Sequence, residues 1–96
     1  MSRVILTRRA EADIIDILTY SIEKFGRRKA LEYQLSLESC FELLALNPLM
    51  GRPAPQIDKD VRRHEHESHV ILYEHANDHV IVLALVHKRN VRKLKL

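Results

Sequence analysis

The sequence has few of the residues on which several classes of protein depend. It contains one cysteine, Cys40, among 96 residues, so an internal disulfide framework is excluded and a reducing compartment is favoured. The only two glycines, Gly26 and Gly51, exclude a glycine-rich phosphate-binding loop. The longest apolar run, residues 80–86, is far shorter than the roughly 20 residues that a membrane helix needs. We therefore expect a single domain over residues 1–96 that is cytoplasmic and makes no membrane contact.

Acidic residues are missing from the C-terminal end. Residues 1–60 hold nine Lys/Arg and nine Asp/Glu, whereas residues 61–96 hold seven basic and four acidic residues and so supply the net charge of +3. The last ten residues contain five basic residues and no acid. A basic end on a neutral body favours an acidic partner, either nucleic acid or an acidic protein. A solvated tail that keeps the protein in solution explains the charge equally well.

Hydrophobic periodicity predicts a strand and two helices in the first half. Residues 3–6 form a short apolar strand, and the Thr7 hydroxyl can cap the helix that follows. Gly26 ends this helix, because glycine takes the left-handed conformation at no steric cost. A second apolar stripe covers residues 30–46, and Asn47-Pro48 ends it, since the residue before a proline avoids helical geometry. The two helices are predicted to form a hairpin.

The second half is predicted to be a sheet. Residues 47–60 carry all three prolines and should form a loop. Three strands follow at 61–67, 69–75 and 80–86, the first polar on both faces as at a sheet edge, the last apolar throughout as in a central strand. Asn77-Asp78 supplies the turn between the last two strands. We expect an α+β fold of order β-α-α-β-β-β, a helical hairpin packed on a small, mainly antiparallel sheet.

Apolar residues from both helices and from the two inner strands should join the hairpin to the sheet. The predicted set is Leu18, Leu37, Phe41, Leu44, Ile71, Leu83 and Leu85. Since successive residues of a strand point to opposite faces, Leu83 and Leu85 should share one side of the sheet.

Six histidines raise the question of metal binding or catalysis. His64 and His66 would point to one face of a strand, but zinc needs three or four ligands and Cys40 lies on a distant helix, so we expect neither a metal site nor a cofactor. A ribonuclease that uses the 2′-hydroxyl of its substrate needs a base, an acid and a cation. One basic set on neighbouring strands could supply them: Arg62, Arg63, His69, His87 and Arg89. Spacing alone is equally compatible with a basic surface that performs no chemistry.

Several segments, in their order and spacing, resemble the ParE branch of the RelE/ParE toxins. The resemblance is carried by Leu6–Ile14, Tyr20, Phe25-Gly26, Ala30, Tyr33, Leu37, Ala45–Arg52, Arg62, Ser68–Tyr73 and Val86–Arg89. It implies the fold expected above. It also implies an antitoxin of the ParD type that wraps around the toxin, and DNA gyrase as the target that the free toxin traps with its DNA cut. RelE relatives instead cut messenger RNA on the ribosome.

Three functions follow from this resemblance. The leading one is a gyrase-directed toxin that needs no catalytic residue of its own. The second is a ribosome-dependent endonuclease, with Arg62, His69, His87 and Arg89 as its catalytic candidates. The third is a family member that binds an antitoxin but is no longer toxic. The nuclease branch often has an aromatic residue near the end of the last strand, and here no aromatic follows Tyr73, which favours the first function.

Two binding surfaces are predicted, one for the target and one for the antitoxin. We expect toxin and antitoxin to form a hetero-oligomer, and we expect no sequence-specific binding of this chain to nucleic acid. Target binding is assigned to Arg62, Lys88, Arg89, Arg92 and Lys93. The apolar stripe of the hairpin is wider than packing on one sheet face needs, so antitoxin binding is assigned to the surplus apolar residues and to the basic cluster at the turn. These residues are Ile14, Ile15, Ile22, Arg27, Arg28, Lys29 and Leu31. An antitoxin helix with acidic and apolar residues would fit such a surface. His69 and Tyr73 share a strand face and are expected to be structural. Glu67 stands where the family usually has a glycine.

Overall fold

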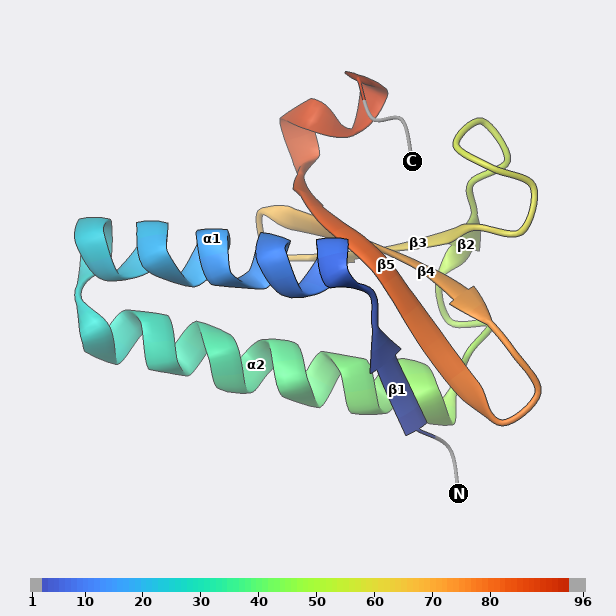
Figure 1. Ribbon diagram of the computed structural model, residues 1–96, viewed down its shortest axis with the longest axis horizontal. Coiled ribbons are helices and arrows are strands. Elements are labelled where there is room, and N and C mark those ends of the chain that lie inside the picture. The colour runs from blue at the N-terminus through green and yellow to red at the C-terminus, as the bar shows by residue number, and fades with distance from the viewer. Residues whose placement is uncertain (1–2, 94–96) are drawn as a thin grey trace.

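The computed structural model describes residues 3–93 and consists of a five-stranded mixed sheet with a helical hairpin on one face (Figure 1). The strand order is β1-β5-β4-β3-β2, in which β1 runs parallel to β5 and the other neighbours are antiparallel. The predicted α+β class, the hairpin and the three-stranded meander are confirmed. The elements, in chain order, are β1 (Arg3–Leu6), α1 (Arg8–Phe25), α2 (Arg27–Leu46), β2 (Arg52–Pro53), β3 (Arg62–His66), β4 (His69–His75), β5 (His79–His87) and the short 3₁₀-helix η1 (Lys88–Lys93).

The helix ends lie at the residues that the sequence indicates. The Thr7 hydroxyl accepts a hydrogen bond from the Ala10 N–H at 3.0 Å and so caps α1. Gly26 has φ +91°, a conformation that side chains disfavour, and it alone separates α1 from α2. α2 ends where the Asn47 N–H bonds to the Leu43 carbonyl oxygen at 2.8 Å, directly before Pro48. In Figure 1 the hairpin turn lies at the end farthest from the strands.

One strand lies within the segment that was predicted to be a loop. Arg52 and Pro53 form β2 and pair with Arg63 and Arg62 of β3, so β3 is the second strand from the edge rather than the edge strand. β2 is short because Pro53 has no N–H to extend the ladder. β3 itself begins at Arg62 and ends at His66, within the predicted range.

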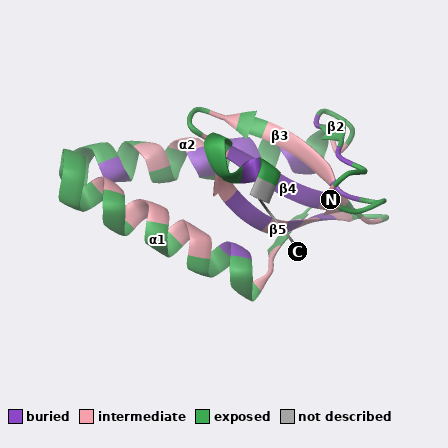
Figure 2. Cartoon of the chain, turned by 90° about the horizontal axis from the view of Figure 1, so that it is seen from above, coloured by how far each residue is buried: buried purple, intermediate pink, exposed green. Residues whose placement is uncertain are grey.

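The hairpin and the sheet share a core on the helix side of the sheet, here called the helix-side core. Its buried members are Ala10, Leu37, Cys40, Phe41, Leu44, Ile71, Tyr73, Val80, Val82 and Leu85. Five of the seven predicted core residues belong to it, while Leu18 is only half-buried. Figure 2 shows that the buried residues of the sheet are concentrated on β4 and β5.

A β-bulge in β5 overturns the prediction for Leu83. Tyr73 pairs with Val82 and Leu72 with Ala84, so Leu83 has no partner on β4. One extra residue reverses the alternation of side chains along a strand. As a result Leu85 faces the helices, whereas Leu83 packs on the opposite side of the sheet.

The opposite side of the sheet has a core of its own, which the predicted fold lacks. Residues from the 54–61 loop and from η1 cover it, and the buried members are Ala54, Val61, Val70, Leu72, Ala84 and Val91. Val91 is 9% exposed and fixes η1 to the sheet. Among the described residues, no helix is long and apolar enough to cross a membrane.

Candidate functional site

A cleft of about 1140 Å³ lies between the helical hairpin and one end of the sheet. α1 and α2 supply two walls, through residues such as Ile17 and Tyr33, and the ends of β4 and β5 supply His69 and His87. Arg89 of η1 also lines it. The cleft therefore collects residues from the two helices, two strands and the C-terminal segment.

A cluster of aromatic and imidazole rings ties α2 to the sheet beside this cleft. The Tyr33 hydroxyl and His69 Nδ1 share a hydrogen bond of 2.7 Å. The Ser36 hydroxyl donates its one hydrogen to the Tyr33 carbonyl oxygen at 2.8 Å, so its oxygen accepts from His66 Nε2 at 2.9 Å. His69 pairs with His87 across the β4–β5 ladder, and the ring centroids lie 5.6 Å apart. These contacts hold the β3–β4 hairpin against α2.

Burial sets the charge of this cluster. It lowers the pKa of His69, and the neighbouring His87 and His66 lower that pKa further. Burial also lowers the pKa of His66, against an opposing effect from Glu67. The pKa of Tyr33 is raised, mainly by burial. At neutral pH His66 and His69 are therefore uncharged and Tyr33 keeps its proton.

Three of the four nuclease candidates lie together, and the fourth lies elsewhere. His69, His87 and Arg89 all line the cleft. His87 Nδ1 accepts from the Arg89 backbone N–H at 3.2 Å and from its Nε–H at 3.3 Å. Arg62 instead pairs with Tyr73 in the ladder and donates to the Gly51 carbonyl oxygen at 2.6 Å. The structure therefore brings three of the four candidates together and places Arg62 apart from them.

The basic residues predicted to bind the target gather mostly on η1. Lys88, Arg89 and Arg92 are exposed on this segment, and Lys88 Nζ lies 3.4 Å from Glu65 Oε2. The side chain of Lys93 lies outside the described residues. Arg62 is separated from this group on β3, where its hydrogen bond to Gly51 gives it a structural role.

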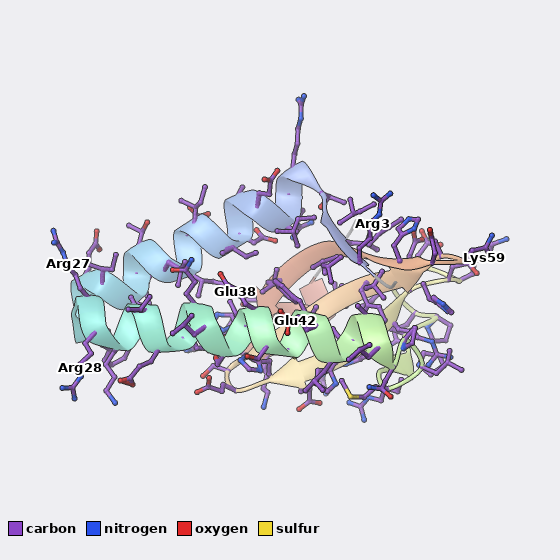
Figure 3. The ribbon with its side chains drawn as sticks, turned by 90° about the horizontal axis from the view of Figure 1, so that it is seen from below. Arg3, Arg27, Arg28, Glu38, Glu42 and Lys59 are labelled. Atoms are coloured by element: carbon purple, nitrogen blue, oxygen red, sulfur yellow. The ribbon has the colours of Figure 1, made fainter. Side chains whose placement is uncertain are left out.

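The residues predicted to bind the antitoxin divide into two groups. Ile15, Ile22 and Leu31 are 63%, 45% and 55% exposed and are free to meet a partner, whereas Ile14 packs against the helix-side core. The basic cluster lies exposed at the hairpin turn, where Figure 3 shows Arg27 and Arg28 extending away from the fold. Arg28 Nε and Lys29 Nζ each lie 3.8 Å from a carboxylate oxygen of Glu32.

Tyr73 anchors the loop after α2. Its hydroxyl donates to the Pro48 carbonyl oxygen at 2.7 Å and accepts from the Gly51 N–H at 2.9 Å. This contact and the Tyr33–His69 hydrogen bond agree with the structural roles expected for Tyr73 and His69. No pattern in the sequence indicates Tyr33 and Ser36 as partners of the histidines, because helical spacing places them on the inner side of α2 but does not indicate their hydrogen-bond partners. In residues 3–93, no group of three or more His, Cys, Asp or Glu side chains is arranged to hold a metal ion.

Comparison with known proteins agrees with this architecture. A solved structure described as a chromosomal ParDE TA system from P. aeruginosa superposes with a TM-score of 0.77 at 20% identity, covers 91% of this chain and 96% of that chain, and shows the same fold. Toxin ParE1 of Caulobacter vibrioides is 40% identical over 68 residues, which are 71% of each chain. The family model described as the ParE toxin of the type II toxin–antitoxin system parDE matches residues 4–92. The chain therefore belongs to the ParE toxin family of type II toxin–antitoxin systems.

Proposed function

We propose that this chain is a toxin that inhibits DNA gyrase by binding, and that a cognate ParD-type antitoxin neutralises it. The observation that carries the proposal is the basic segment η1. Lys88, Arg89 and Arg92 are exposed on it, while Val91 is buried against the sheet and holds the segment in place. A fixed positive surface suits a complex of gyrase with DNA, which is anionic.

The state of the histidines favours binding over catalysis. A nuclease needs a group that is free to take a proton from the substrate, with a cation beside it. Here His69 Nδ1 is engaged by Tyr33 and His87 Nδ1 accepts from Arg89, so one nitrogen of each ring is already hydrogen-bonded within the protein and only the Nε2 atoms remain for a substrate. The nuclease alternative keeps one observation in its favour, which is that His69, His87 and Arg89 line the same cleft.

The antitoxin is proposed to dock a helix on the exposed side of the hairpin. Ile15, Ile22 and Leu31 offer apolar contact there, and the cluster Arg27–Lys29 offers positive charge. An amphipathic helix with acidic residues beside its apolar stripe would match both. The P. aeruginosa structure with the same fold is described as a ParDE system, which supports a partner of this type.

The antitoxin surface is tested by measuring affinity for the product of the neighbouring antitoxin gene. Ile15→Asp and the triple charge reversal at Arg27–Lys29 should each weaken binding by about tenfold or more, because the first removes an apolar contact of the proposed surface and the second removes its positive charge. Gln56→Asp, in the exposed loop across the sheet, is the control. Binding that survives both changes would place the antitoxin elsewhere.

The target is tested with purified toxin, gyrase, ATP and plasmid DNA. Trapped, cleaved DNA is expected, and reversing the charges of Lys88, Arg89 and Arg92 one by one should reduce it stepwise, because a binding surface loses affinity residue by residue. Lys59→Glu should leave it unchanged. His87→Ala should have a graded effect, whereas loss of a general acid or base costs about 10²–10⁴-fold in rate.

Two other results would overturn the gyrase proposal. Codon-positioned cleavage of ribosome-bound messenger RNA, abolished by His87→Ala alone, would make the protein a nuclease. Retained antitoxin binding with neither gyrase poisoning nor RNA cleavage would make it a non-toxic member of the family.

A further inference from the structure

The hairpin has an apolar side that faces away from the cleft. Ile17 of α1 and Tyr33 of α2 line the cleft. A residue two positions away along a helix is rotated by about 200°, and therefore lies on the opposite side. The large apolar residues at such positions are Ile15 on α1 and the pair Leu31 and Leu35 on α2, exposed to 63%, 55% and 55%.

Charges of opposite sign flank the two leucines of α2. Arg28 comes one turn before Leu31, and Glu38 comes one turn after Leu35. The spacing of these four residues is three, four and three, which is the spacing of a helix seam that packs on another helix. Figure 3 shows this side, with Arg27 and Arg28 at the hairpin turn and Glu38 and Glu42 farther along α2. If a second α2 runs in the opposite direction beside the first, its leucines fall opposite these leucines, and its Arg and Glu fall opposite charges of the other sign.

We propose that a second copy of this chain docks here, with its α2 antiparallel to the first. Both pairs of residues are centred on position 33, so a two-fold axis at that point places Leu31 against the partner's Leu35. The same axis places Arg28 against the partner's Glu38, and it forms each contact twice. Arg28 is able to reach across, because its side chain is 88% exposed and its ion pair with Glu32 is long, at 3.8 Å.

Charge complementarity makes the second copy a specific occupant. A parallel copy would set Arg28 against Arg28 and Glu38 against Glu38, which is unfavourable, so only the antiparallel arrangement satisfies both charges. The contact involves few apolar side chains from each copy and belongs to the weak class of interfaces, with a dissociation constant in the micromolar range or above.

Leu31 and Arg28 also belong to the proposed antitoxin surface, so the antitoxin would displace the second copy. Only this competition depends on the proposed function.

Sedimentation equilibrium of the purified full chain tests the dimer. Its average mass should rise from monomer toward dimer between about 1 and 100 µM, as a weak interface requires. Arg28→Glu and Glu38→Arg each turn two attractive pairs into two repulsive ones and should raise the dissociation constant about tenfold or more. Leu35→Asp should abolish the dimer. Lys59→Glu, which Figure 3 shows far from the hairpin turn, is the matched control.

Mixing the two charge variants provides the decisive comparison. In a mixed pair, Glu at position 28 meets Arg at position 38, and Arg28 meets Glu38, so both ion pairs return and the mixture should dimerise when neither variant does alone. The double variant Arg28→Glu/Glu38→Arg should dimerise for the same reason. Circular dichroism establishes that each variant is folded.

A monomeric wild type over this range would overturn the proposal. So would folded single variants that dimerise like the wild type, or a mixture that stays monomeric. Antitoxin affinity is read separately with Glu38→Arg, because Glu38 lies outside the proposed antitoxin surface. Loss of dimer with retained antitoxin binding supports the second copy as occupant, whatever the fate of the gyrase proposal.

Discussion

The carboxylate of Asp13 in α1 accepts a hydrogen bond of 3.0 Å from the backbone N–H of Leu85, 72 residues later in the chain. β1 pairs with β5 only as far as Leu6 and Val82, so the rest of that strand edge needs other partners. The Thr7 hydroxyl donates to the Leu83 carbonyl oxygen at 2.8 Å, and Asp13 bonds to Leu85. Side chains of the N-terminal end of α1 thus complete the β5 edge at the bulge and fix the helix beside the cleft.

Asp13→Ala should lower the free energy of unfolding by about 1.5–3 kcal/mol, the usual contribution of a hydrogen bond to a charged group. The Asp13 side chain is 22% exposed, so water replaces this bond poorly. Urea unfolding measures the change, with Asp16→Ala on the exposed part of the same helix as control. Asp13→Asn keeps an acceptor oxygen and should lose less. Equal stability of Asp13→Ala and wild type would show that the bond contributes nothing.

Gly51→Ala should destabilise the fold by about 1–3 kcal/mol through overpacking. A Cβ at this position would lie 2.6 Å from the Tyr73 hydroxyl oxygen and 2.7 Å from the Arg63 carbonyl oxygen. Tyr73→Phe removes the first of these contacts, so the double variant should lose less stability than the sum of the two single variants. A double-mutant cycle of urea midpoints measures this coupling. Additive effects would indicate that the clash is with groups that Tyr73→Phe leaves in place, namely the Arg63 carbonyl oxygen and the ring atom Cε1 at 2.8 Å.

Glu67→Gly should raise the free energy of unfolding by about 0.5–1 kcal/mol. Glu67 has φ +52°, in the left-handed region, at the turn between β3 and β4. This backbone geometry favours glycine, the residue that the resemblance to ParE toxins implies at this position. Glu67→Ala keeps the strain and loses the same 3.6 Å contact with His66, so it serves as the control in thermal unfolding. A glycine variant less stable than Glu67→Ala would contradict the argument.

Acidification should destabilise the protein through His69. Its folded-state pKa is lowered, mainly by burial, so below the ordinary value of 6.5 the unfolded chain binds more protons than the folded one. The contribution of His69 to the free energy of unfolding is fully present above about pH 6.5 and is lost as the pH falls through the folded-state pKa. His69 faces Tyr33, His66, His87 and Glu67, of which the two histidines add to the lowering and Glu67 opposes it.

His69→Gln should therefore flatten the fall in urea midpoint between about pH 7.5 and 5. The exposed residue His75, at the end of β4, supplies the matched control His75→Gln. An unchanged slope in His69→Gln would mean that other groups carry the acid sensitivity.

The order of the main elements can be predicted from the sequence, because the signals for it are local. Thr7, Gly26 and Pro48 act on the backbone beside them, and the apolar periods of the helices and strands need no knowledge of distant contacts. Family membership also follows from the sequence, since it depends on residues in a fixed order along the chain. For the basic C-terminal segment, the sequence indicates the positive charge but not the 3₁₀-helix that presents it.

Which residues share a site depends on how distant elements pack, and local patterns in the sequence do not indicate it. Leu83 lies on the side of the sheet opposite to the predicted one, because the bulge that places it there depends on the register with β4. The two-residue strand β2 forms through its pairing with β3. Arg62 donates to the Gly51 carbonyl oxygen and lies away from the histidines, whereas Tyr33 bonds to His69, 36 residues later in the chain. Periodicity tells which side of an element a residue occupies, whereas the packing of distant elements fixes what that side meets.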